Sequence, residues 1–588
     1  MMTMSSLIEP EISELSARYS NVEAHKLNGA TYTPSDLATF VAENILEAAE
    51  LPKTGIIRVL DPAVGDGALL HALLKCLPDD ALERVEVWGY DTDADAIQIA
   101  TTRLANTFTG LPLHIEQKDF LEHVLTLKGS DLFSDSEQEP FHLVIANPPY
   151  VRTQILGADQ AKALAQSFGL TGRVDLYYPF LLGISKVLAI GGVTGIITSN
   201  RFMTTKSGEA VRQALLSRFQ ILHAWDLGDT KLFDAAVLPA VLLAKGIRNL
   251  QHSHTQNIAF STIYETKDPA QSQCTEVLAA LSSDDDTVVE VADGRRFRVR
   301  HGSLNNGDDP KGVWRVGTVA TDTWLTTVES NTWQTFRHIG KIRVGVKSTA
   351  DKVFIRSDWN DIPEGRPELL RPLLTRHCAR RFRATTPNNP KHRKEILYPH
   401  TVVDGRRCAV DLSLYPRAAL YLERHRDVLE ARTYVLDAGR NWFELWVPQD
   451  PSAWPAPKLV FPDISDKPIF WIDTDGGVVN GECYWLCCEN EESTDLLWLA
   501  LAVANSTFIE AFYDHKFNNK LYAGRRRFIT QYVEQFPLPD PARAEVQHII
   551  NLAKKIHALI PSSEAEAMEV ELDELVWGVF GLGEKVAR

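Results

Sequence analysis

Residues 59–68 read Val-Leu-Asp-Pro-Ala-Val-Gly-Asp-Gly-Ala, and this stretch decides the fold. A strand expected over 56–60 runs into a turn with two glycines, and a helix is expected from about 68 to 76. The glycines remove side-chain bulk, so the backbone can approach a ligand closely. The stretch predicts a βα unit with a binding site of nucleotide size at its turn. Taken alone, it is equally compatible with a tight βα turn that carries a capping Asp.

The first 250 residues alternate strands and helices outward from that unit. Strand, helix, strand in repetition predicts an α/β fold with a doubly wound, mostly parallel sheet. Ligands bind beyond the carboxyl ends of the strands in such sheets, and Asp91 stands at the end of the next strand, where an acid commonly takes ribose hydroxyls. Further strands are expected over 85–90, 113–117, 142–146, 193–199 and 237–244, with helices over 35–46, 94–106, 176–189 and 209–219.

A second motif follows the hydrophobic strand expected over 142–146, where the chain reads Asn147-Pro148-Pro149-Tyr150. Proline fixes its own φ and pushes the preceding residue to an extended conformation, so the Asn147 side chain and a neighbouring backbone carbonyl can converge rigidly. Two converging acceptors can take hydrogen bonds from both hydrogens of one NH₂ group, and this turns the nitrogen lone pair out of conjugation. Tyr150 offers a flat face on which a planar amine-bearing group can stack. The motif predicts chemistry at an exocyclic amine.

Length, cysteine content and charge limit the class of protein further. The chain has 588 residues, 44% of them hydrophobic, which favours two or three globular domains over disorder. Seven scattered cysteines and the lack of a secretory h-region favour a reducing, cytoplasmic location, and every apolar run is too short to span a membrane. The net charge of −16 argues, on average, against a polyanionic partner.

Two basic clusters in the C-terminal half depart from that average. Between residues 366 and 407 there are eleven Lys or Arg against three acids, and residues 515–527 combine cations with aromatics and contain no acid. Such clusters predict a phosphate-binding face, although solvated or internally paired surface explains either of them equally well. The residues expected to contact DNA are Arg376, Arg380, Arg381, Arg383, Lys391, Lys516, Lys520, Arg525, Arg526 and Arg527.

The alternation of strands and helices fails after about residue 245, which sets the expected domain limits. We expect a catalytic domain over 1–265, a connecting region over 266–330, and a mixed α+β recognition domain over 331–545 with short strands that include 352–355. Helices over 546–588 are expected to close the chain, with Asp540 as an N-cap before Pro541.

Together, residues 61–67 and 147–150 resemble the motifs of S-adenosylmethionine-dependent amino-methyltransferases. With the earlier segment 29–34 (Gly-Ala-Thr-Tyr-Thr-Pro), the motif order is similar to that of the gamma class of DNA adenine N6-methyltransferases, to which the TaqI-type enzymes belong. The resemblance implies that Asn147, Pro148 and Tyr150 are catalytic and that Tyr150 and Phe233 pack against a flipped target base. It also implies S-adenosylmethionine as cofactor, bound by Thr31, Tyr32, Pro34, Asp61, Pro62, Ala63, Gly65, Gly67, Asp91, Asp119, Phe120 and Asn147.

Within that resemblance, individual roles follow position by position. Asp91 matches the ribose-binding acid, Asp119 matches the acceptor from the cofactor's adenine amine, and Phe120 or a neighbour would pack on that ring. Residues 345–354 and 461–465 look like parts of the TaqI-type specificity domain. The implied protein is a site-specific methyltransferase of a bacterial restriction–modification system that acts on duplex DNA, is a monomer, and has a separate cognate restriction endonuclease as its partner.

Several alternatives stay open. Asn-Pro-Pro-Tyr also occurs in enzymes that methylate a glutamine amide of a protein and in some RNA methyltransferases, and cytosine N4 is chemically a close acceptor. A recognition subunit without catalysis or a single-chain restriction enzyme would share the basic second half, but all the named motifs are present and no well-spaced nuclease motif accompanies Pro462-Asp463. No metal is expected, because Cys483, Cys487 and Cys488 lack a matching ligand pair.

Overall fold

The computed structural model of the chain contains two compact units, residues 1–318 and, apart from residues 521–524, residues 319–588. The structure describes residues 33–127, 139–149, 166–170, 175, 177–233, 238–247, 258–282, 285–307, 309–488, 494–517 and 525–582. Each unit has its own hydrophobic cores.

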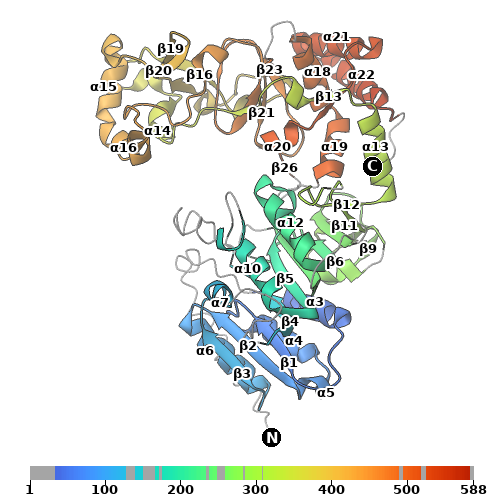
Figure 1. The fold of residues 1–588 in the computed structure, drawn as a ribbon. Helices are drawn as coiled ribbons and strands as arrows, with labels where there is room; N and C mark the ends of the chain where they lie inside the picture. Colours follow the sequence, from blue (N-terminus) through green and yellow to red (C-terminus); the bar gives the residue numbers. More distant parts are fainter. Residues whose placement is uncertain are drawn as a thin grey trace. The chain divides into compact units, whose positions relative to one another are not determined.

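The first unit is built on one twelve-stranded sheet (Figure 1). Its path runs β3-β2-β1-β4-β5-β7-β6-β8-β11-β10-β9, with β12 paired to β11. The first five strands along this path are parallel, whereas β7 is antiparallel to both of its neighbours. The strands are β1 (Ile57–Asp61), β2 (Val85–Asp91), β3 (Leu113–Gln117), β4 (Phe141–Ala146), β5 (Leu188–Ser199), β6 (Phe219–Asp226), β7 (Pro239–Gly246), β8 (Ala259–Glu265), β9 (Ser272–Gln273), β10 (Thr287–Glu290), β11 (Arg296–Asn305) and β12 (Arg315–Gly317).

Helices cover both faces of this sheet, which confirms the doubly wound prediction. Successive strand residues point to opposite faces, so Val59 of β1 joins one core and Leu60 the other. The first core contains helices α3 (Ser35–Ala48), α4 (Ala68–Cys76) and α6 (Ala94–Thr107), and the second contains α7 (Phe120–Thr126), α10 (Tyr177–Val187) and α12 (Glu209–Arg218).

The prediction that residues 266–330 only connect two domains is wrong. Its residues supply β9 to β12 of the first unit's sheet, and helix α13 (Val319–Ser330) opens the second unit. The acidic and polar composition of this region concealed the strands: β10 is four residues long, and the last six residues of β11 are exposed or half-buried. The first unit therefore extends to residue 318, about fifty residues beyond the expected limit.

The second unit is a mixed α+β structure, as expected. One sheet runs β14 (Arg343–Val344), β25 (Cys483–Leu486), β21 (Lys458–Pro462), β23 (Trp471–Asp473) and β17 (Phe382–Arg383). A second sheet runs β15 (Ile355–Arg356), β18 (Glu395–Leu397), β16 (Leu370–Leu374) and β24 (Val478–Val479). Further helices include α14 (Asp351–Phe354), α15 (Pro416–Arg424), α16 (Arg426–Glu430), α17 (Thr433–Asp437) and α20 (Thr530–Val533).

The closing helices belong to this unit and share one core with its middle part. Figure 1 shows α18 (Thr494–Ala504) beside α21 (Ala544–Leu559) and α22 (Ser563–Val579), and α19 (Thr507–Phe517) also lines that core. No single described helix is long and apolar enough to cross a membrane; α18 and α19 meet that test only as a pair, bent by 77°.

Two local expectations in this unit are wrong. Residues 352–354 form the end of the helical turn α14 rather than a strand, and of the expected strand over 352–355 only Ile355 lies in one, as the first residue of β15. Helix α21 begins at Ala544 with Arg543 as its N-cap. The Asp540 carboxylate instead accepts a hydrogen bond from Ala542 N at 2.9 Å, so it stabilises a turn ahead of the helix.

Candidate cofactor and amine site

Four of the predicted site residues follow four neighbouring parallel strands. Asp119, Asp91, Asp61 and Asn147 lie at or just after the carboxyl ends of β3, β2, β1 and β4, which are adjacent in that order in the sheet. Figure 1 shows these strands side by side at the N-terminal end of the chain. The topology thus brings residues 28 to 86 positions apart to one edge, as the crevice rule for open α/β sheets predicts.

The glycine turn between β1 and α4 has the conformation that its sequence predicts. Gly65 and Gly67 have φ of +49° and +81°, a region that residues with a side chain rarely adopt. A Cβ on Gly67 would also lie 3.1 Å from the Cα of Ala100 in α6. Val64 N donates to Tyr90 O at 2.9 Å, which ties the turn to β2. The turn therefore presents bare backbone at the sheet edge.

Asp61 is the most unusual group at this edge. Its carboxyl group is fully buried, and Oδ1 accepts a hydrogen bond from Ala63 N at 3.0 Å. Oδ2 is buried without a hydrogen-bond partner among the described residues. Burial, with smaller contributions from the Asp91 and Asp66 carboxylates, raises the pKa of Asp61 from 3.8 to about 8. An unsatisfied buried acid is costly, so this position fits a ligand group that is cationic or a hydrogen-bond donor.

Asp91 connects the next strand to the glycine turn. Its Oδ2 accepts a hydrogen bond from Gly65 N and its Oδ1 one from Asp93 N, both at 3.0 Å. The carboxylate is therefore fixed at the end of β2 and beside the turn, where the predicted ribose partner should stand. Its half-buried position keeps it accessible from that edge.

Asp119 and Phe120 take different local roles. Asp119 is the N-cap of α7, and its Oδ1 accepts from Leu121 N at 2.7 Å and from Glu122 N at 3.2 Å. Phe120 is 2% exposed and stacks on Phe180 with ring centroids 5.6 Å apart. Because Phe120 is a core residue here, its predicted packing against an adenine ring stays a prediction, and a neighbouring side chain is the other candidate.

Asn147 has an oriented side chain. Its Nδ2 donates a hydrogen bond to Thr33 Oγ1 at 3.0 Å, so the amide nitrogen faces the segment that leads into α3. Thr33 lies between Tyr32 and Pro34, which are both predicted to bind the cofactor, yet sequence reasoning assigned it no role. Its position between these two residues was the available signal. Pro148 is buried and follows directly, whereas Tyr150, Thr31 and Tyr32 lie outside the described residues.

Sequence reasoning also missed a buried polar network farther along the same edge. Asp226, at the end of β6, accepts from Asn200 Nδ2 at 2.9 Å and from Tyr264 OH at 2.6 Å. Burial raises the pKa of Asp226. Asp226 also accepts from Gly228 N at 3.1 Å, which stabilises the turn that leads to Phe233. Polar residues at the ends of strands were the signal that could have indicated this network.

Phe233, the predicted second stacking partner of a target base, is 7% exposed. It belongs to the apolar core that contains α3, α4 and α6, so its ring packs inside the first unit in this structure. Stacking by Phe233 therefore stays a prediction that requires this side chain to change its packing. The residues that follow it, 234–237, lie outside the described part of the chain.

The second predicted basic cluster is largely engaged inside its own unit. Arg526 is 5% exposed and forms ion pairs with Asp514 at 2.8 Å and Glu510 at 3.1 Å. Arg527 pairs with Asp463 at 3.1 Å. Removing Arg526 would take an ion-pair partner from two half-buried acids, so this residue supports the fold. The prediction that Arg526 contacts DNA is wrong for this geometry.

The other predicted DNA contacts are divided between paired and exposed side chains. Arg381 forms an ion pair with Glu569 at 2.9 Å, and Lys516 forms one with Glu329 at 3.1 Å. Arg383 and Lys391 are exposed. Arg376 is exposed but lies 3.5 Å from Glu482, Arg380 is half-buried, Arg525 is exposed at the start of a described segment, and Lys520 lies outside the described residues.

Comparisons with known proteins agree with the architecture. Residues 84–233 match the Eco57I restriction-modification methylase family, and residues 414–538 match the TaqI-like C-terminal specificity domain. The chain is 39% identical over 576 residues to the type II methyltransferase M.BanIII of Aneurinibacillus aneurinilyticus, covering 95% of this chain and 97% of that one. It is 24% identical over 550 residues to M.BstVI of Geobacillus stearothermophilus, covering 88% and 91%.

Among solved structures, the type IIL restriction-modification enzyme MmeI, determined in complex with DNA, has a similar fold. The TM-score is 0.57 at 14% identity, over 99% of this chain and 75% of that one. The α/β sheet that matches a methylase family and the attached specificity domain together define a DNA-modifying methyltransferase. The chain belongs to the type II DNA methyltransferases of restriction–modification systems. It uses S-adenosylmethionine and binds duplex DNA.

Proposed function

We propose that the chain methylates N6 of adenine in duplex DNA. The observation that carries this proposal is the placement of Asn147 and Pro148 at the end of β4, next in the sheet to β1 with its buried Asp61 and glycine turn. The side chain of Asn147 is oriented by Thr33 through its nitrogen. Its oxygen and the Pro148 carbonyl are then suited to accept both hydrogens of an exocyclic amine.

S-adenosylmethionine supplies a methyl group on a sulfonium, which is a good leaving group. The residues of the chain that would hold it are Asp61, the backbone of residues 63–67 and Asp91, and the unpartnered Oδ2 of Asp61 fits its positive charge. Asn147 and Pro148 would hold the amine with its lone pair turned out of the ring. The proton leaves the nitrogen after the methyl group is gained, so no strongly tuned general base is needed.

The target base must leave the helix for this geometry to be reached. An adenine amine inside the duplex is paired and stacked, so we propose that the adenine is flipped out and that Tyr150 stacks on it. Cytosine N4 is the second candidate acceptor, because it too is an exocyclic amine. We further propose that the protein acts as a monomer and that a separate endonuclease cleaves the same unmodified site.

Thr33→Val is expected to lower kcat about 10-fold with little change in KM for DNA or cofactor, because the loss of one hydrogen bond frees the Asn147 amide to rotate. Thr33→Ser keeps the hydroxyl and should restore the rate. Single-turnover methylation kinetics measure both variants. Equal kcat values for wild type and Thr33→Val would show that Thr33 does not position Asn147.

Asp91→Ala is expected to weaken S-adenosylmethionine binding by about 1–3 kcal/mol, the usual cost of leaving a buried hydrogen-bonding group unsatisfied. Isothermal titration calorimetry measures this affinity without DNA. Asp93→Ala is the matched control, because Asp93 only caps α6, where it accepts from Asp95 N at 2.9 Å. Equal affinities of the two variants would limit Asp91 to fixing the glycine turn.

A further inference from the structure

The edge of the first unit's sheet continues beyond Asn147. Strands β5, β7 and β6 follow β4 in the sheet, on the side opposite to β1 and β2. β5 is parallel to β4, and β7 is antiparallel to both β5 and β6, so the ends of β5 and β6 and the start of β7 meet at the edge where Asn147 lies. The proposed cofactor residues Asp61 and Asp91 lie on the β1 and β2 side. A ring that brings its amine to Asn147 must therefore enter from the side of β5, β7 and β6.

Three buried polar side chains meet on that side and form what we call the edge network. Asn200 directly follows β5, Asp226 ends β6, and Tyr264 lies in β8, which is next to β6. Their exposed fractions are only 9%, 4% and 8%. Asp226 accepts from Asn200 Nδ2 at 2.9 Å and from Tyr264 OH at 2.6 Å, and Asn200 Nδ2 also lies 3.3 Å from Tyr264 OH. Each member is thus hydrogen-bonded to the other two.

The edge network is tied to the backbone of three strand ends. Asn200 reaches Asp226 through its side chain, and its backbone N donates to Leu238 O at 2.9 Å. Leu227 N, just after β6, donates to Pro239 O at the start of β7, also at 2.9 Å. Asn200 therefore links the end of β5 to the end of β6 and to the residue before β7.

The turn after β6 is held by the same network and by β8. Gly228 N donates to Asp226 Oδ1 at 3.1 Å. Asp229 Oδ1 accepts from Glu265 N, the last residue of β8, at 2.8 Å. A surface that is already fixed in one conformation loses little entropy when a ligand binds against it.

The edge network is not placed to contact a substrate through Asp226. Both oxygens of this carboxylate accept hydrogen bonds from donors of the same unit, and the residue is almost fully buried. A buried polar network whose members are satisfied favours one arrangement of the segments that it joins. Its effect on a reaction must therefore pass through the backbone that it holds.

We infer that Asn200, Asp226 and Tyr264 are positioning residues, which hold the end of β5, the turn after β6 and the start of β7 as a rigid wall that places the amine-bearing ring beside Asn147. None of the three contacts the ring. The inference rests on the proposed amine site at Asn147, but it does not depend on whether the ring is adenine or cytosine.

Asn200→Ala and Tyr264→Phe each remove a hydrogen bond to Asp226, and each is expected to slow methyl transfer about 10-fold, because a misplacement of about 1 Å at the reacting atoms can cost about 10²-fold. Single-turnover transfer of labelled methyl groups to unmodified genomic DNA measures the rate, whichever base accepts the label. The double variant should lose less than the product of the two single losses, since both act through Asp226. Calorimetry should show unchanged affinity for S-adenosylmethionine, because Asp61 and Asp91 lie on the other side of β4.

Ser261→Ala is the matched control for the loss of a buried hydroxyl from β8. Ser261 precedes Tyr264 by three positions, is 1% exposed, and has its hydroxyl 2.8 Å from His223 Nε2 and 2.9 Å from His301 Nδ1. Thermal melting should show a loss of stability comparable to that of Tyr264→Phe, while the rate of methyl transfer stays at the wild-type value. An equal rate loss in Ser261→Ala would reduce the edge network to a general support of the fold and would overturn the inference.

Two further results would also overturn the inference: wild-type rates in both Asn200→Ala and Tyr264→Phe, or weaker cofactor binding in either variant. Comparison with Asn147→Ala separates this inference from the proposed function. If Asn147→Ala loses activity while both network variants keep it, the wall is wrong and the amine site stands. If Asn147→Ala keeps the wild-type rate, the amine site itself fails, and the inference that rests on it fails as well.

Discussion

Asn147→Ala is expected to lower kcat by about 10²-fold or more while S-adenosylmethionine and duplex DNA still bind. Removing one preorganised polar group from the reacting atoms typically costs this much in rate. The amine would lose one of its two acceptors, so its lone pair would remain conjugated with the ring. Single-turnover methylation under saturating DNA and cofactor measures the rate, and calorimetry and anisotropy measure the two affinities.

A matched control for this variant lies on α3. Asn44 also has a hydrogen-bonded amide, which donates to Phe40 O at 2.8 Å, but it has no predicted part in the amine site. Asn44→Ala should methylate at the wild-type rate. A near wild-type rate for Asn147→Ala would remove Asn147 from catalysis, and a matching loss in both variants would assign the effect to the packing of α3.

Asp61→Asn is expected to stabilise the fold and to weaken cofactor binding at the same time. The pKa of Asp61 is raised from 3.8 to about 8, so the folded protein holds a proton that the unfolded chain releases. The contribution of Asp61 to the free energy of unfolding is therefore complete below pH about 4 and is lost as the pH rises to about 8. The stability advantage of the variant should grow across this range by up to about 1.4 kcal/mol per pH unit.

The affinity of Asp61→Asn for the cofactor should fall, although its fold is more stable. A cationic ligand beside Asp61 favours the carboxylate, so the wild type should release a proton when S-adenosylmethionine binds near pH 7. The variant should release none and bind about 10- to 100-fold more weakly, the range expected for a lost hydrogen bond to a charged group. Calorimetry in two buffers with different ionisation enthalpies measures the proton, and chemical denaturation at several pH values measures the stability.

Asp66→Asn provides the control for both measurements. Asp66 lies in the same turn, but its carboxylate pairs with Arg103 at 3.0 Å. The Asp66→Asn variant should still release a proton when the cofactor binds, and its stability should still fall with rising pH, because the Asp66 carboxylate makes only a small contribution to the raised pKa of Asp61. If Asp61→Asn behaves in the same way as Asp66→Asn, Asp61 is a structural turn residue and no partner of the cofactor.

The edge of the sheet could be predicted from sequence because its signals are local. A strand, a glycine turn and a helix adjoin within residues 57–76, and α4 begins at Ala68 as its sequence indicates. Asn147 follows a continuous apolar strand, so its place at a strand end was also readable. The role of Thr33 could not be predicted from sequence, because its contact with Asn147 joins residues 114 positions apart and depends on how α3 packs on the sheet.

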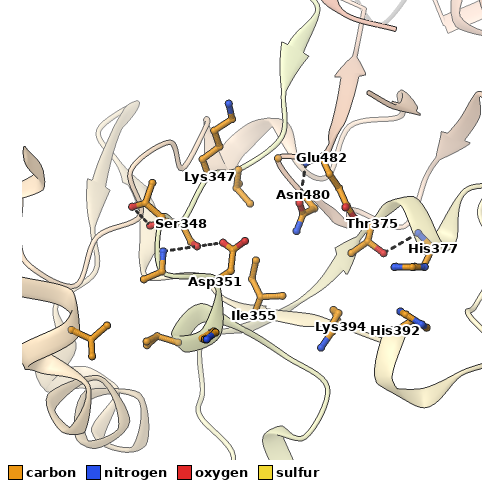
Figure 2. Close-up of a pocket in the computed structure, with 17 residues that line it drawn as sticks. Lys347, Ser348, Asp351, Ile355, Thr375, His377, His392, Lys394, Asn480 and Glu482 are labelled. Carbon is orange, nitrogen blue, oxygen red and sulfur yellow. Dashed lines mark hydrogen bonds between the residues drawn. The ribbon is translucent and has the colours of Figure 1, made fainter. Parts of the chain in front are cut away.

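The basic clusters show what composition cannot decide. The sequence shows that residues 525–527 are all Arg, but only the fold shows that Asp514 and Glu510 form ion pairs with Arg526. The second unit also shows the converse case, in which the fold brings together charges that are far apart in the sequence. Lys347 and Lys394 lie 47 positions apart on different elements, and only the packed unit shows that both line one cavity (Figure 2). Charge that is distributed over distant segments leaves no local pattern.

Mass spectrometry of nucleosides from methylated duplex DNA tests the central claim most directly. Purified protein, genomic DNA from an unmodified host and methyl-labelled S-adenosylmethionine are incubated, and the DNA is digested to nucleosides. The proposed chemistry predicts that the label appears as N6-methyldeoxyadenosine and that Asn147→Ala abolishes it. Label in N4-methyldeoxycytidine, or DNA that stays unlabelled while the protein binds the cofactor, would contradict the proposed acceptor.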